Sequence, residues 1–215
     1  MRWGCEPGKV VNVLKEAPYE ARERVLMVAE RLFTERGYAA VTLRDIANEL
    51  GIKQASLYYH APGGKEDLFV TVTERSLARH RVGLEAAMTT AGDDLRAQLQ
   101  AAARWLLSQP PIDWHRMMTS DLPAISPEHA QRLTVAAGAA IIYPLAARFE
   151  AARDREGLVM PSQAEMLAGA FIAIMGAMQD VSYATQLPKH LMADEMIDVL
   201  LDGIRPRVPV TPMGE

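Results

Sequence analysis

Residues 42–68 read TLRDIANELGIKQASLYYHAPGGKEDL, and they encode two short helices joined by a tight turn. Thr42 and Asp45 have the spacing of a capping box, in which each side chain accepts from the other residue's backbone N–H, so a helix is expected to begin after Thr42. Gly51 is expected to end this helix in the left-handed conformation that glycine adopts without strain. A second helix is expected over residues 54–60. It is too short to be stable alone, so packing must hold it.

The second helix is expected to present a polar and aromatic outer surface. At about 100° per residue, a buried Leu57 leaves Ala55 and Tyr59 on the opposite side, flanked by Ser56 and Tyr58. In a helix-turn-helix the second helix reads base edges in the major groove, and hydroxyl and basic groups around it contact phosphates. The residues that we expect at such a DNA surface are Thr42, Arg44, Lys53, Gln54, Ala55, Ser56, Tyr58, Tyr59, His60 and Lys65.

Over residues 19–68 the chain resembles the DNA-binding domain of the tetracycline-repressor (TetR/AcrR) family of bacterial regulators. The family pattern is a helix ending in F-x-x-x-G-(Y/F), then T-x-R-x-I-A-x-x-x-G-V, a small-(S/T)-L-Y-x-(H/Y)-F turn and a K-E-(D/E)-L helix start. The matching residues are Phe33, Gly37, Tyr38, Thr42, Arg44, Ile46, Ala47, Gly51, Ile52, Ala55, Ser56, Leu57, Tyr58, Tyr59, His60, Lys65, Glu66 and Leu68.

The resemblance also implies roles for individual residues and shows two departures. Ala61 stands where the family usually has an aromatic residue, and the 62–64 loop is one residue longer than the commonest form. Neither departure touches the reading helix. The residues that resemble the family's phosphate contacts are Thr42, Tyr59, His60 and Lys65. Those that resemble its groove-facing positions are Arg44, Gln54, Ala55, Ser56 and Tyr58.

Each of these side chains also has a purely structural interpretation. Tyr58 and Tyr59 could be packing aromatics, and Lys65 could be only a solvated helix start. Arg44 could pair with Asp45, Glu49 or another acid. Any one of these residues could match the family pattern by chance. A chance match at so many positions in the right order is much less probable.

Composition favours a globular, all-α protein. Of 215 residues, 49% are hydrophobic and only 6% aromatic, which suits a helical core. A single cysteine, Cys5, excludes an intrachain disulfide and is typical of a reducing cytoplasm. The N-terminus lacks the apolar core of a signal peptide. The most apolar run, residues 166–178, is too short to span a bilayer, so no membrane partner is expected.

The charge balance differs along the chain. Residues 1–80 hold 12 Lys and Arg against 11 Asp and Glu, whereas residues 81–215 hold 11 against 16. These sum to the net charge of −4. Because the basic excess in the first part is only +1, phosphate contact must depend on where the cations lie.

Turn residues and helical periodicity divide the rest of the chain. Gly37 is expected to end the first helix, and Pro144 to kink a long later one. The helices expected are 19–36, 42–50, 54–60, 65–91, 94–108, 114–125, 126–156, 162–185 and 190–204. The expected organisation is a flexible arm at 1–18, a DNA-binding domain at 19–64, a ligand-binding and dimerisation domain at 65–205, and a disordered tail at 206–215.

The resemblance implies that the second domain binds an effector and forms a homodimer through the helices at 162–185 and 190–204. Small residues in the first of these helices permit close approach, although intrachain packing would use them equally well. An apolar or aromatic effector is the default expectation. The candidate lining residues are Trp105, Trp114, Met117, Met118, Phe149, Phe171, Met175 and Met178, and each also fits a plain core position.

Catalysis and metal binding have no motif in this sequence. His115 and His129 are fourteen residues apart with a proline between them, so no metal site and no cofactor are expected. The sequence therefore predicts a transcriptional regulator, most simply a repressor released from a double-stranded DNA operator by a small effector. The alternatives are a small-molecule carrier that does not read DNA and a helical enzyme.

Overall fold

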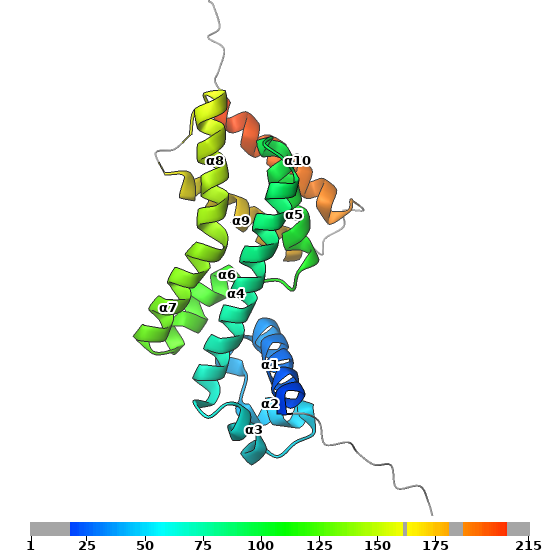
Figure 1. Ribbon diagram of the computed structural model, residues 1–215, viewed down its shortest axis with the longest axis vertical. Coiled ribbons are helices and arrows are strands. Elements are labelled where there is room, and N and C mark those ends of the chain that lie inside the picture. Colours follow the sequence, from blue (N-terminus) through cyan, green and yellow to red (C-terminus); the bar gives the residue numbers. More distant parts are fainter. Residues whose placement is uncertain (1–17, 161–162, 181–186, 206–215) are drawn as a thin grey trace, which may run out of the picture.

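The computed structural model describes residues 18–160, 163–180 and 187–205, and all regular elements among them are helical (Figure 1). The expected arm except Pro18, both the first residue and the end of the helix expected at 162–185, and the expected tail lie outside the described residues. The all-α prediction is confirmed. In order, the α-helices are α1 (Pro18–Ala40), α2 (Leu43–Leu50), α3 (Gln54–His60), α4 (Gly64–Thr90), α5 (Leu95–Ser108), α6 (Trp114–Arg116), α7 (Pro127–Ala137), α8 (Tyr143–Glu156), α9 (Ala164–Asp180) and α10 (Lys189–Ile204).

The local chemistry of α2 and α3 follows the sequence closely. Thr42 Oγ1 accepts from Asp45 N at 3.2 Å, and Asp45 Oδ2 accepts from Thr42 N at 2.8 Å, so the capping box is confirmed. Gly51 ends α2 with φ 67°, as expected. Leu57 is fully buried and fastens the short α3 to the helices around it.

The first helix differs from its expected end. Gly37 does leave the helical conformation, with φ 79° and ψ 169°, but helix α1 is assigned on to Ala40 across this break. The Tyr38 N–H, released by the break, donates to Asp121 Oδ1 at 2.8 Å. The helix end expected at Gly37 is therefore replaced by a break that a distant carboxylate stabilises.

The long helix α4 connects the two ends of the molecule. Its first turns pack against α1, and its later turns pack against α5 and the segment that precedes α8 (Figure 1). One hydrophobic cluster surrounds α1–α3 and the start of α4, and a second lies among the later helices. Met117, Leu122, Ile125 and Leu133 also pack in the first cluster, although they lie 45 or more residues further along the chain than its other members. We call α1–α3 the head and the helices around the second cluster the body.

The single helix expected at 126–156 is divided by a wide π-type turn, η3 (Gly138–Ile142), where Tyr143 N donates to Gly138 O. Pro144 follows at the start of α8 and has no N–H to donate, so the change of helical geometry falls just before it. Similarly, the helix expected at 114–125 is split into α6, a π-helical segment η1 (Met117–Asp121) and a 3-10 turn η2 (Leu122–Ala124).

By length and composition alone, Pro127–Glu156 could cross a membrane, with a mean hydropathy of 1.3. However, α7, η3 and α8 lie along α4 (Figure 1), and Leu133, Ile141 and Phe149 are buried in the two clusters. The core helix of a soluble protein can have the same composition, and we interpret Pro127–Glu156 as part of the core.

Candidate nucleic-acid interface and ligand cavity

Helix α3 lies at the lower tip of the head and presents one side to solvent (Figure 1). Tyr59 is 80% exposed and Tyr58 is 48% exposed. Leu57, on the inner side of the same helix, is 0% exposed. Lys53, Gln54, Ala55 and Ser56 are exposed as well. The helix thus leaves amide, hydroxyl and phenol groups available to solvent. Because Tyr58 and Tyr59 are solvated, neither acts as a core aromatic.

Thr42 and Arg44 lie beside this surface, at the start of α2, and both are exposed. The Thr42 hydroxyl donates to Asp45 Oδ2 at 2.6 Å as part of the capping box. These bonds, with the charge of Arg44 and Arg36 nearby, lower the pKa of Asp45. Glu49, one alternative partner for Arg44, pairs with Arg31 at 2.6 Å.

His60 and Lys65 are more enclosed than the other predicted contacts. His60 packs edge-on against Tyr59, with ring centroids 5.3 Å apart. The Lys65 ammonium lies 4.1 Å from the centroid of the Tyr38 ring, within cation–π range. Burial lowers the pKa of Lys65, and the charges of Asp121 and Asp45 oppose that shift. Lys65 therefore has a packing role in the head in addition to any contact with phosphate.

Arg116 and Asp121 attach the body to the head. Arg116 Nη2 donates to the carbonyls of Phe33 at 3.3 Å and Thr34 at 2.7 Å, close to the break in α1. Asp121 is 3% exposed and accepts from Tyr38 N and from Arg116 Nε, the latter at 3.4 Å. A Cβ at Gly37 would lie 3.0 Å from Arg116 Cδ, so glycine makes room for the guanidinium. We call these contacts the Arg116–Asp121 clamp.

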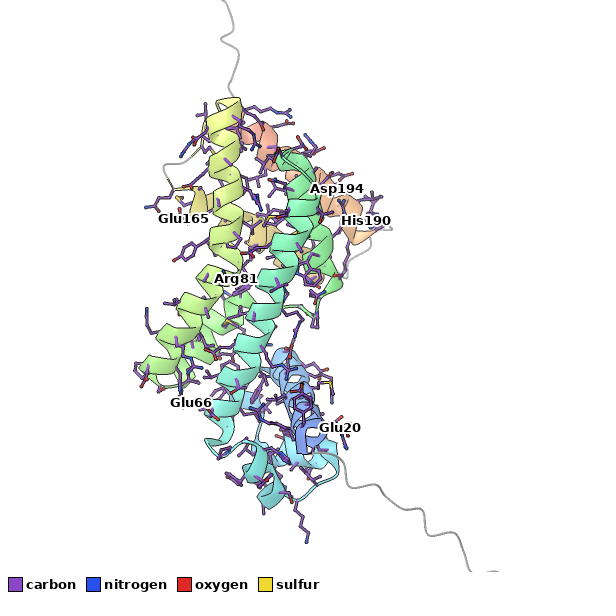
Figure 2. The ribbon with its side chains drawn as sticks, in the orientation of Figure 1. Glu20, Glu66, Arg81, Glu165, His190 and Asp194 are labelled. Atoms are coloured by element: carbon purple, nitrogen blue, oxygen red, sulfur yellow. The ribbon has the colours of Figure 1, made fainter. Side chains whose placement is uncertain are left out.

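A second link joins the start of α4 to the start of α7. Glu66, labelled in Figure 2, accepts at Oε1 from Ser126 N at 2.9 Å, and the same oxygen lies 2.7 Å from His129 Nδ1. The hydrogen bonds from Ser126, followed by that from His129, lower the pKa of Glu66 to about 2. The sequence showed no signal for either link, because the partners are about 60 to 80 residues apart.

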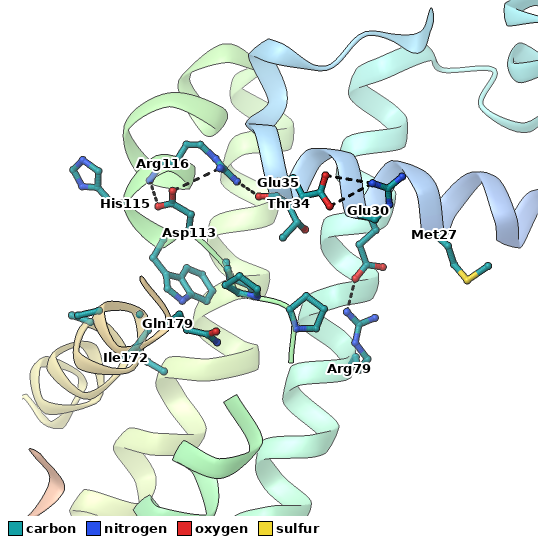
Figure 3. Close-up of a pocket in the computed structure, with 18 residues that line it drawn as sticks. Met27, Glu30, Thr34, Glu35, Arg79, Asp113, His115, Arg116, Ile172 and Gln179 are labelled. Atoms are coloured by element: carbon teal, nitrogen blue, oxygen red, sulfur yellow. Dashed lines mark hydrogen bonds and ion pairs between the residues drawn. The ribbon is translucent and has the colours of Figure 1, made fainter. Parts of the chain in front are cut away.

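A cavity of about 900 Å³ lies between α1, the segment preceding α6, and α9 (Figure 3). Its rim carries ion pairs, including Arg79 Nη2 to Glu30 Oε1 at 2.5 Å. Arg116 of the clamp is also one of its lining residues. The lining comprises Met27, Glu30, Arg31, Thr34, Glu35, Arg79, Pro110, Pro111, Ile112, Asp113, Trp114, His115, Arg116, Ile172, Ala173, Gly176, Ala177 and Gln179.

A second cavity, of about 670 Å³, lies between η1, the α7–α8 junction and α9. Trp114, Ile172 and Ala173 line both cavities. Tyr143 and Glu165 contribute polar groups to the second one. The two cavities thus lie next to each other, and the indole of Trp114 in α6 lines both of them.

The eight candidate ligand residues are not brought together. Trp114 lines both cavities and Met118 lines the second. Met117 is buried in the head cluster, and Trp105 packs beside Gly83 of α4. Met178 is half-buried in α9 and lines neither cavity. Phe149, Phe171 and Met175 are buried in the body core, and Met175 also lines a small chamber next to the first cavity, together with Trp114.

Comparison with known proteins gives matches concentrated in the head. Residues 25–72 match the family model for bacterial regulatory proteins of the tetR family. The HTH-type transcriptional regulator LmrA of Bacillus subtilis is 47% identical over 51 residues, which cover 24% of this chain and 27% of LmrA. The regulator AcrR of Shigella flexneri is 36% identical over 62 residues, 29% of this chain and 28% of AcrR. The chain thus spans about a quarter of the length of these curated relatives.

Solved structures extend the likeness to the body. A transcriptional regulator from Saccharomonospora viridis, in complex with choline, has a TM-score of 0.67 and 23% identity, covering 88% of this chain and 100% of that chain. AibR, in complex with isovaleryl coenzyme A and operator DNA, has a TM-score of 0.66 and 19% identity, covering 84% of this chain and 97% of that chain. At such identities the likeness shows a shared fold.

Proposed function

This chain belongs to the tetR family of bacterial regulatory proteins through its head, and from that premise we propose that the whole protein is a ligand-responsive, sequence-specific transcriptional regulator. The observation that carries the proposal is the surface of α3, where Leu57 is buried and its neighbours are solvated. Gln54 can pair with adenine, and Ala55 suits a thymine methyl group. As an intracellular DNA-binding protein it would work in the cytoplasm.

The proposed interface divides into groups that read bases and groups that hold phosphates. Arg44, Gln54, Ala55, Ser56 and Tyr58 would face the groove, where they contribute sequence preference. The proposed phosphate contacts are Thr42, Lys53, Tyr59, His60 and Lys65, which would contribute affinity and salt dependence.

The test is titration of a labelled duplex from the protein's own upstream region, followed by fluorescence anisotropy at low salt, with a scrambled duplex of equal length. Tyr58→Ala should reduce the preference for the upstream duplex, whereas Lys53→Ala should weaken binding to both duplexes and reduce the salt slope by roughly one. Tyr143→Ala removes another exposed tyrosine, from the body, and should bind as the wild type does. Equal binding of both duplexes by the wild type would refute the proposal.

The protein is proposed to act as a homodimer through α9 and α10, the described parts of the helices expected at 162–185 and 190–204. Met166 is 61% exposed and Val199 65% exposed, which leaves apolar surface on both helices. A two-fold pair would hold its reading helices about 34–36 Å apart, one turn of DNA. Val199→Glu should give a monomer in light-scattering chromatography, whereas Val82→Glu, on the 69% exposed Val82 of α4, should not. Unchanged mass for Val199→Glu would exclude α10 from the interface.

The effector is proposed to bind in the 900 Å³ cavity and to release the protein from its operator. Arg116 supports this route, because it lines the cavity and also holds the end of α1. An effector that preferred another arrangement of Arg116 would shift the population away from the DNA-competent separation of the heads.

Repression itself is tested by reporter expression with the gene present and deleted. Lower expression on deletion would identify an activator instead.

A further inference from the structure

His80 is a buried polar residue in the middle of α4 that the DNA-binding surface does not use. It is 2% exposed, and neither Nδ1 nor Nε2 has a hydrogen-bond partner within the described part of the chain. A buried polar group without a partner has lost its hydrogen bonds to water and gained none in exchange, which destabilises the fold. Such a group in a native protein therefore requires an explanation, and a missing ligand is one.

His80 lines a small chamber of about 30 Å³ that adjoins the large cavity. The chamber is large enough for a hydroxyl group or a single water molecule. Six residues line both spaces, so the chamber and the large cavity lie against the same side chains. They are Pro110, Ile112, Trp114, Ile172, Gly176 and Gln179.

The chamber is uncharged at neutral pH. Burial, with a smaller contribution from the charge of Arg79, lowers the pKa of His80 to about 4. Arg79 itself is paired with Glu30 at the rim. Apart from His80, no acidic or basic side chain lines the chamber among the described residues, and the other lining side chains with polar atoms are the Gln179 amide and the Trp114 indole. A neutral imidazole offers one donor and one acceptor.

These features select a chemical class of ligand. A carboxylate would lack a cation in the chamber, and an ammonium group would lack an anion, so burying either would be costly. A hydroxyl both donates and accepts, which matches the neutral ring. The indole of Trp114 and the side chains of Ile112 and Ile172 suit an apolar or aromatic remainder.

We propose that the cavity binds an uncharged, mainly apolar molecule whose hydroxyl group enters the chamber and hydrogen-bonds to His80. The proposal rests on the effector function proposed above and specifies the class of effector. It assigns to His80 the role of a specificity-determining residue, in a position that the sequence does not distinguish from an ordinary buried histidine.

The test compares three probes that share a two-ring aromatic body: 2-naphthol, naphthalene and 2-naphthoate. Calorimetric titration of the full chain at pH 7.5, without DNA, should show 2-naphthol binding roughly five- to tenfold more tightly than naphthalene, the value of one buried hydrogen bond. The naphthoate should bind less tightly than the naphthol. The ring-nitrogen NMR signal of His80 should shift with 2-naphthol and not with naphthalene.

Three variants locate the preference. His80→Leu should bind both neutral probes equally, and His80→Gln should keep most of the preference because an amide also donates and accepts. His115→Leu is the matched control, since His115 lines the large cavity but not the chamber. It should keep the full preference. Folding of His80→Leu is checked by its melting temperature, which should not fall, because leucine leaves no unpartnered polar atom.

Several results would overturn the inference. These are no binding of any probe, equal binding of naphthol and naphthalene by the wild type, tighter binding of the naphthoate, or a preference that survives in His80→Leu. If a buried water molecule already satisfies His80, the wild type would bind naphthol and naphthalene equally. DNA binding is measured separately, and His80→Leu should bind the upstream duplex normally. A wild type that bound no specific DNA would refute the proposed regulator and leave the probe result standing.

Discussion

Asp121→Ala is expected to loosen the joint between head and body. Asp121 is almost fully buried, and it accepts from Tyr38 N at 2.8 Å and from Arg116 Nε at 3.4 Å. Alanine removes both acceptors at once. The Tyr38 N–H then loses its partner at the break in α1, and Arg116 loses its nearest carboxylate.

The expected cost can be estimated from these contacts. A hydrogen bond to a charged group contributes about 1.5–3 kcal/mol, and a broken buried ion pair costs about 3–5 kcal/mol. The Arg116 side chain is 27% exposed and keeps its bonds to the α1 carbonyls, so the ion-pair figure is an upper bound. We expect a loss of about 2–4 kcal/mol, which lowers the melting temperature by roughly 5–15 °C in a chain of this size.

The assay is thermal unfolding followed by circular dichroism at one fixed protein concentration, because dimerisation would otherwise shift the midpoint. Asp121→Asn should fall between wild type and Asp121→Ala, since its amide oxygen can still accept from Tyr38. Asp154→Ala is the control: this carboxylate is 71% exposed beside Arg153, and its loss should cost under about 1 kcal/mol. A midpoint for Asp121→Ala within 2 °C of the wild type (about 0.5–1 kcal/mol) would refute the reasoning.

Three further outcomes are expected. Leu57→Ala should destabilise the head by about 2–5 kcal/mol in urea unfolding, because a fully buried side chain leaves a cavity under α3; a change under 1 kcal/mol would contradict that packing. Thr42→Ala should cost about 0.5–2 kcal/mol by removing the capping box, measured in the same way, and no change would show the cap to be dispensable. Stability should depend on pH in two windows. The folded-state pKa of His80, about 4, is below its usual 6.5, so the unfolded chain takes up this proton more readily and stability falls as pH drops from about 6.5 to 4. The folded-state pKa of Glu66, about 2, is below its usual 4.5, so its contribution is lost between about pH 4.5 and 2. Denaturant midpoints across pH should flatten in the upper window for His80→Leu and in the lower window for Glu66→Gln; a variant that kept the wild-type slope would exclude that group as the cause.

The helix-turn-helix could be predicted almost residue by residue because its determinants are local. Thr42 and Asp45 are three residues apart and cap each other, and Gly51 closes the same short helix. The burial of Leu57 follows from the helical repeat once the neighbouring residues are known to be polar or aromatic. Such signals operate within one or two turns, so they are visible in the sequence.

The ligand site could be predicted only in part, because large apolar residues suit a core and a cavity equally. Trp114 and Met118 line cavities, whereas Phe149 and Phe171 fill the core of the body. The distinction depends on which helix faces cover one another. Composition and periodicity do not contain that information.

The sequence by itself determined where the short helices of the head begin and end and which side of α3 is left to solvent. Only the tertiary structure decided that Asp121 meets Tyr38 across 83 residues and that His80 is buried without a partner at the edge of a cavity. Caps, turns and helical repeats depend on backbone geometry within a few residues. The partners of a buried polar group depend on how distant helices pack, which is settled by the whole chain at once.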